Sequence, residues 1–160
     1  MRIKKVRNIG NGEKVKIDYE SENSAGGFDI MSLECADAAR PEFYDALHAL
    51  IPQVIQTLEL PADWKPRITV SGFTLSYDKS NTMSAVIVAK RELENSSSPH
   101  NLATPIKGQF FHDEDQPDIM STDKHFDEEM EKKLITAMGE AVRYIQGNRA
   151  QRDLFEGGGE

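Results

Sequence analysis

The sequence contains a single cysteine and no long apolar run, and both shortages restrict what the protein can be. Cys35 has no second cysteine to pair with, so an internal disulfide is excluded and a reducing compartment is favoured. No stretch of about 18 apolar residues is present, which predicts that no helix spans a membrane. Charged residues open the chain without an apolar block behind them, so we expect no secretory signal. Together these features predict a cytoplasmic protein.

The motifs of the common catalytic and cofactor sites are also missing. No glycine-rich loop ends in Gly-Lys-Ser/Thr before a helix, and the turn at 10–12 leads into a strand pattern. Zinc requires several His or Cys ligands at short spacings, which this chain does not offer. The serines at 96–98 lie near His100, but neighbouring loop residues lack the rigid scaffold and the third orienting group of a catalytic site. We therefore predict no catalytic residues and no cofactor, and we favour a non-enzymatic protein while leaving an enzymatic activity open.

Charge is abundant but unevenly distributed along the chain. The formal net charge is −8, and a protein this acidic lacks the broad basic surface that general nucleic-acid affinity requires. The segment 1–16 is nevertheless basic, with Glu13 as its one acidic residue. The candidates for contacts with nucleic-acid phosphates are therefore Arg2, Lys4, Lys5, Arg7, Lys14 and Lys16. The alternative interpretation of this segment is a solvated strand face.

Acidic residues are concentrated in 113–131, where nine carboxylates accompany Lys124. Carboxylates gathered in this way suit a hard cation, and His112 and His125 lie beside them in the sequence. The segment lacks the position-specific spacing and the central glycine of a calcium-binding loop. We therefore predict a solvated acidic segment and no metal site.

The apolar pattern predicts a single α+β domain over 1–146. Helical spacing of apolar residues predicts two amphipathic helices, at 41–60 and at about 123–146. The resulting order is β-β-β-α-β-β-(β)-α, which predicts an antiparallel sheet of five to six strands with both helices on one face. The predicted strands, taken from alternation and short apolar runs, are 3–9, 14–20, 28–34, 67–77, 83–91 and a short edge strand at 106–111.

Three local features sharpen this prediction. Pro52 lies inside the first helix and should kink or split it, because proline removes a backbone hydrogen bond. The apolar phase switches at Ser71-Gly72, where a β-bulge would restore the inward-facing set. The run 83–91 is almost continuously hydrophobic, so we expect a central strand buried on both faces, followed by a loop over 93–105.

A helix stop at Gly147-Asn148 separates the domain from the end of the chain. The residues 147–160 are rich in glycine and charge, and we predict that they form a flexible tail. The alternative is a helix that continues past Gly147 and packs Leu154 and Phe155 onto the domain.

The tail contains the pentapeptide Gln151-Arg152-Asp153-Leu154-Phe155. It resembles the Gln-Leu-Ser/Asp-Leu-Phe motif by which many bacterial replication and repair proteins bind the sliding clamp, and four of the five positions match. The departure is Arg152, where the family has leucine, and it puts the affinity in doubt. The resemblance implies that Leu154 and Phe155 enter an apolar pocket while Gln151 hydrogen-bonds at its rim.

A second resemblance concerns the run 83–105, MSAVIVAKRELENSSSPHNLATP. It is similar to uncharacterised small proteins of tailed phages and prophages. The similarity implies no activity, but it implies a phage-encoded protein in the cytoplasm of the host cell. Such an origin is compatible with a role in replication or recombination.

These observations lead to three functional hypotheses. The first is a non-enzymatic adaptor of phage DNA replication or recombination that binds the host sliding clamp through its tail. The second is a single-stranded DNA-binding protein, whose sheet combines the basic segment 1–16 with Phe or Tyr side chains as a stacking platform and is followed by an acidic tail. The third is an inhibitor or acidic decoy of a host enzyme or defence protein, with 113–131 as the mimic. We also expect a homodimer, because a second copy would cover the exposed face of the sheet.

Overall fold

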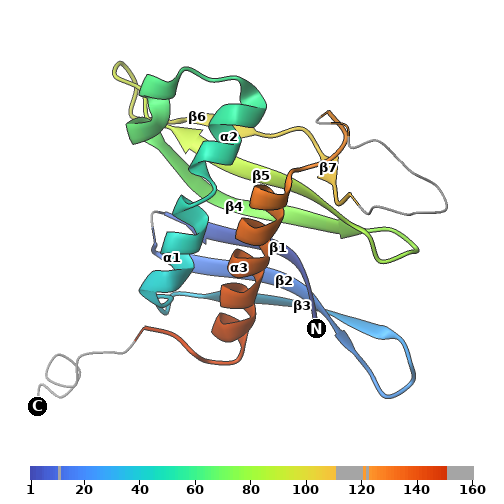
Figure 1. Cartoon of the computed structure of the whole chain (residues 1–160). Coiled ribbons are helices and arrows are strands. Elements are labelled where there is room, and N and C mark those ends of the chain that lie inside the picture. Colours follow the sequence, from blue (N-terminus) through green and yellow to red (C-terminus); the bar gives the residue numbers. More distant parts are fainter. Residues whose placement is uncertain (11, 111–120, 122, 151–160) are drawn as a thin grey trace, which may run out of the picture.

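The computed structural model describes residues 1–10, 12–110, 121 and 123–150. It shows one sheet with three α-helices on one of its faces (Figure 1). The strands are β1 (Arg2–Ile9), β2 (Lys14–Glu22), β3 (Phe28–Cys35), β4 (Ile68–Tyr77), β5 (Met83–Arg91), β6 (His100–Ala103) and β7 (Lys107–Gly108). The helices are α1 (Pro41–His48), α2 (Ile51–Leu58) and α3 (Glu128–Ile145), with a 3-10 helix, η1, at Ala62–Arg67.

The sheet is antiparallel throughout its named strands. Its order is β3-β2-β1-β4-β5-β6, and the short β7 pairs with β5 outside this path. The predicted α+β fold is therefore confirmed. We call the side that carries the helices the covered face and the other side the open face.

The first three strands form an antiparallel meander, and β2 shows how the two faces arise. Val15 and Ile17 are fully buried on the covered face, whereas Lys16 and Asp18 point to the open face. The same period-two alternation recurs in β5, where Ala85, Ile87 and Ala89 are buried and the residues between them are partly exposed.

Strand β4 joins this meander to the second half of the sheet. Its register with β5 shifts between Val70 and Gly72, which confirms the bulge predicted at Ser71-Gly72. Gly72 has a φ of +155° and lies opposite Arg7 of β1. A Cβ added to it would lie 1.8 Å from the carbonyl oxygen of Val6. Glycine is therefore required for β1 and β4 to come this close.

The helices follow from their local sequence. Pro52 lies in the first turn of α2, which is separate from α1, so the predicted split of the first helix is confirmed. α3 begins at Glu128, later than the predicted start near residue 123. The reason is that the Asp127 carboxylate accepts the N–H of Met130 at 2.8 Å and caps the helix there.

Two predictions about the second half of the sheet are wrong. In β5, Ile87 and Ala89 are buried, but Val86 and Val88 on the open face remain partly exposed, so this strand is not buried on both faces. Its hydrophobicity reflects one covered face plus β-branched residues that suit any strand. The predicted loop over 93–105 contains β6, which pairs with the end of β5. This strand has four residues, which is too short a signal to reveal an edge strand from the sequence.

The core lies between the covered face and the helices. Phe43 of α1, Phe73 of β4 and Leu134 of α3 are at most 2% exposed. Removing such a side chain from water contributes about 1.5–3 kcal/mol, so this layer supplies most of the favourable free energy of folding.

None of the helices in the described part of the chain combines the length and the apolar composition that a membrane crossing requires. The longest of them, α3, has 18 residues and carries charged side chains along its exposed side.

Candidate functional site

The end of the described chain is tied to the body by contacts around Arg149, which we call the anchor. Arg149 Nη1 donates to Asp37 Oδ2 at 2.9 Å and to the Cys35 Sγ at 3.2 Å. Its Nε donates to the carbonyl oxygen of Tyr144 at 3.2 Å, and its guanidinium carbon lies 4.3 Å from the centroid of the Tyr144 ring. The anchor therefore joins the end of the chain to β3, to the connection between β3 and α1, and to α3.

Tyr144 forms the buried side of this anchor. Its ring is 1% exposed within the core, and its hydroxyl donates to the carbonyl oxygen of Asp37 at 2.5 Å. Burial raises the pKa of the Tyr144 hydroxyl, and the neighbouring Cys35 raises it further. The hydroxyl therefore stays protonated at physiological pH and remains a hydrogen-bond donor.

The last described residues, 146–150, follow α3 and remain in contact with the body. α3 ends at Ile145 and Gly147 has a φ of +90°, which confirms the predicted helix stop. The N–H of Ala150 donates to the carbonyl oxygen of Ala38 at 3.1 Å, so residue 150 is in contact with the connection between β3 and α1. The predicted partner-binding residues, Gln151, Asp153, Leu154 and Phe155, lie outside the described residues.

Three of the six basic candidates in 1–16 lie within reach of carboxylates on neighbouring strands. Arg2 Nη2 lies 2.5 Å from Glu20 Oε2, and Lys4 Nζ lies 3.5 Å from Glu20 Oε1. Lys14 Nζ lies 4.0 Å from Glu34 Oε1. The hydrogen bond from Arg2 holds the pKa of the Glu20 carboxyl below its usual range. These cations are thus partly neutralised by the sheet itself.

The remaining three cations differ from one another. Arg7 lies along the open face, where its guanidinium donates to the carbonyl oxygen of Phe73 at 2.9 Å and to Thr74 Oγ1 at 2.7 Å. Burial lowers the pKa of Arg7, but an arginine stays charged at neutral pH. Lys5 and Lys16 form no ion pair with another described residue. They are the two cations of this segment with the most capacity to contact a phosphate.

The aromatic side chains give the open face little to stack on. Phe43, Phe73 and Tyr144 are buried in the core. Phe28 is 53% exposed, but it lies at the edge of the sheet, where the Arg2 guanidinium carbon is 5.0 Å from its ring centroid. A stacking platform uses several exposed rings in succession, and the described open face does not present such a row.

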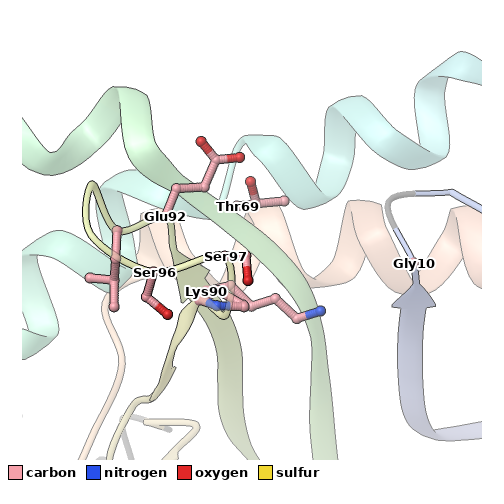
Figure 2. A pocket seen from close by; sticks show the side chains of 8 residues that line it. Gly10, Thr69, Lys90, Glu92, Ser96 and Ser97 are labelled. Carbon is pink, nitrogen blue, oxygen red and sulfur yellow. The ribbon is translucent and has the colours of Figure 1, made fainter.

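A pocket of about 350 Å³ lies where the ends of β4 and β5 meet the loop that follows β5 (Figure 2). Its polar lining includes Lys90, Ser96 and Ser97. Ser96 Oγ accepts the N–H of Ser98 at 3.1 Å, and His100 does not line the pocket. Among the described residues no hydrogen bond links either lining serine to a base, so this pocket does not show the paired nucleophile and base of covalent catalysis.

The predicted acidic segment is described only in part, since residues 111–120 and 122 lie outside the described residues. In the described part of the chain, no group of three His, Cys, Asp or Glu side chains is arranged to hold a metal ion. Asp127 is used as the cap of α3. His125 Nδ1 lies 3.3 Å from the Ser121 backbone nitrogen, which donates to it.

Two features of the surface carry no sequence signal of their own. The anchor joins residues more than 100 positions apart, and no local pattern predicts that Arg149 meets Asp37. The exposure of Phe28 and Ile30 on β3 is equally hidden, because their alternation is the same as that of a strand with one buried face.

Comparisons with protein-family models, with curated proteins and with solved structures gave no match to this chain. Its function must therefore be argued from its own residues and their arrangement.

Proposed function

We propose that this protein is a non-enzymatic adaptor of phage DNA replication or recombination that binds the sliding clamp of its bacterial host through residues 151–155. The described body includes Ala150, the residue directly before this segment, and the pentapeptide would supply the contacts with the clamp. As an adaptor, the body would then bring a second binding partner to the clamp.

The observation that supports this proposal most is the position of the motif relative to the anchor. The last described hydrogen bond of the chain is made by Ala150, and the resemblance to the clamp-binding motif begins at Gln151. In the sequence, no residue separates Ala150 from the first residue of the motif. A short peptide next to a folded body can insert two apolar side chains, here Leu154 and Phe155, into a pocket on a partner.

The two other hypotheses have less support. Single-stranded DNA binding would rely on Lys5 and Lys16, because the other basic candidates are engaged with carboxylates or carbonyl oxygens on the sheet. A decoy function would rely on an acidic segment whose larger part lies outside the described residues. The clamp-binding hypothesis requires neither free lysines on the sheet nor the acidic segment.

The test is the binding of purified sliding clamp to immobilised full-length protein, compared with the variant Leu154→Ala/Phe155→Ala. Loss of two hot-spot side chains should weaken binding by about 100-fold or more. A chain that ends after Ala150 should lose binding to the same extent, and it keeps every contact of the anchor. Equal melting temperatures of the three proteins would show that the body is intact.

A gain-of-function variant makes the test sharper. Arg152→Leu restores the residue that the family pattern has at this position, and it should strengthen clamp binding. If the doubly substituted protein binds the clamp as tightly as the original chain, the motif has no role and the proposal is wrong. The same holds if the original chain shows no binding and Arg152→Leu does not produce any.

A further inference from the structure

The strand β3 forms one edge of the sheet, and two acidic side chains, Asp29 and Glu34, are its only charged residues. All eight residues pair with β2 in a continuous register without a bulge. The strand contains no lysine or proline, which are the residues that most often block edge-to-edge pairing. Its other side is unpaired among the described residues. An edge of this length is a template for another strand.

The side chains of this edge are apolar and unusually exposed. Ile30 is 82% exposed, Phe28 is 53% exposed and Met31 is 44% exposed. Phe28 and Ile30 point to the open face, and Met31 points to the covered face, because it pairs with Tyr19 in line with the buried Ile17. Apolar side chains on both sides of one free edge indicate a surface that is covered in the working protein.

The backbone of β3 shows which groups are free to bind a partner strand. The hairpin between β2 and β3 begins with a hydrogen bond from the Asn23 N–H to the carbonyl oxygen of Gly27, at 2.9 Å. In an antiparallel ladder, the backbone N–H and C=O groups of one residue bond to the neighbouring strand, and those of the next residue point away from it. Counting from Gly27, the backbone groups that point outward belong to Phe28, Ile30, Ser32 and Glu34.

We infer that the protein forms a homodimer in which β3 pairs antiparallel with β3 of a second copy, around a two-fold axis at Met31. Outward-pointing groups then meet outward-pointing groups over residues 28–34 of each strand. The two sheets become one continuous sheet, with the helices of both copies on the same side. In this register the opposed positions are Phe28 with Glu34, Asp29 with Leu33, Ile30 with Ser32, and Met31 with itself.

Charge and apolar contact select this register and a second copy as the occupant. Each acidic side chain, Asp29 and Glu34, faces an apolar residue of the other copy, so no two carboxylates are opposed. The two Met31 side chains meet at the axis, and the two Ile30 side chains lie diagonally across it. An axis at Ile30 would pair only five residues of each strand, and an axis at Ser32 would leave the exposed Phe28 without an opposed residue of the partner strand. The edge is thus self-complementary, as a two-fold interface requires. This inference does not depend on the clamp-binding proposal.

The first experiment measures the mass of the full-length protein in solution by light scattering over a range of concentrations. The original chain should be a dimer, and Ile30→Lys should convert it to a monomer, because a charged side chain blocks a free edge. Ile30→Val keeps the shape and polarity of the edge and should remain a dimer. Ile30 is 82% exposed, so neither change disturbs the core, and circular dichroism would verify this.

The second experiment determines the register by disulfide cross-linking in a Cys35→Ser background. Met31→Cys should form a covalent dimer on oxidation, since opposed residues of a non-hydrogen-bonded pair have Cα atoms about 4.5 Å apart, within the range of a disulfide. Glu34→Cys is the matched control, because in this register it lies six positions, or about 20 Å, from its own copy. It should stay monomeric on a denaturing gel.

Several results would overturn the inference. These are a monomer at every concentration, a dimer that Ile30→Lys leaves intact, and cross-linking of Glu34→Cys as readily as Met31→Cys. A monomer that instead captures a peptide strand on β3 would show that the edge serves a different protein.

Discussion

The two faces of the sheet are stabilised in different ways. On the covered face Val6, Ile17 and Ile87 are fully buried beneath the helices. On the open face, polar side chains of neighbouring strands bond to one another, such as Ser32 Oγ donating to Asp18 Oδ1 at 2.6 Å. Apolar burial therefore holds the sheet to the helices, and polar pairing organises the side that faces water.

This difference indicates where the protein can change without unfolding. Exposed ion pairs contribute about 0–1 kcal/mol each, whereas a fully buried aliphatic side chain contributes about 1.5–3 kcal/mol. The open face and the free edge at β3 can therefore be altered for binding at little cost in stability. The covered face cannot, and neither can the contact between β1 and β4 at Gly72.

The largest expected effect is that of Gly72→Ala. The new Cβ would lie 1.8 Å from the Val6 carbonyl oxygen, so β1 and β4 would have to separate at the contact that joins the two halves of the sheet. We expect a loss of more than about 4 kcal/mol in the free energy of unfolding, or failure to fold, measured by urea denaturation. Gly139→Ala on the exposed side of α3 is the control, because nothing lies within 4 Å of its added Cβ. It should stabilise the protein by about 0.5–1 kcal/mol, and a similar result for Gly72→Ala would contradict the prediction.

The contrast between the faces can be measured on adjacent residues of β5. Ile87→Ala removes a fully buried side chain from the covered face and should lower the free energy of unfolding by about 2–5 kcal/mol. Val88→Ala removes a partly exposed side chain from the open face and should cost about 1 kcal/mol or less. Equal losses in urea denaturation would mean that the open face is covered in solution, and that the two faces are not as different as the single chain indicates.

Much of this architecture could be predicted from the sequence, because its signals are local. The alternation in β2 indicates one buried face, the phase switch at Ser71-Gly72 indicates a bulge, and Pro52 marks the break between α1 and α2. Each of these depends only on residues within a few positions of one another.

The remaining features depend on contacts between distant parts of the chain. The hydrophobicity of β5 does not reveal whether a second layer covers Val86 and Val88, and here none of the described residues does so fully. The anchor at Arg149 is built from three separate segments, so its residues have no common spacing. The free edge at β3 exists because of the strand order, which alternation within one strand cannot report.

A smaller effect is expected at the start of α3, at the border of the covered face. Asp127→Ala removes the carboxylate that accepts the N–H of Met130, and it should lower the free energy of unfolding by about 1 kcal/mol. Asp127→Ser retains an acceptor at this position and should restore most of the loss in thermal denaturation. If serine and alanine are equally destabilising, the charge of Asp127 rather than its capping bond is what matters.

The smallest effect concerns the open face and depends on pH. The hydrogen bond from Arg2 lowers the pKa of Glu20 in the folded protein, so the folded state binds a proton at this group less readily than the unfolded chain does. The resulting stabilisation is present above the unfolded pKa of about 4.3 and is lost as the pH falls through the lower folded value. Glu20→Gln should therefore reduce the acid-induced drop in melting temperature between about pH 6 and about pH 3. Glu22→Gln, at the exposed end of the same strand, is the matched control and should leave the drop unchanged. If the two variants behave alike, the pair of Arg2 and Glu20 contributes nothing to the folded state, and the polar pairing of the open face is a consequence of the fold and not a support for it.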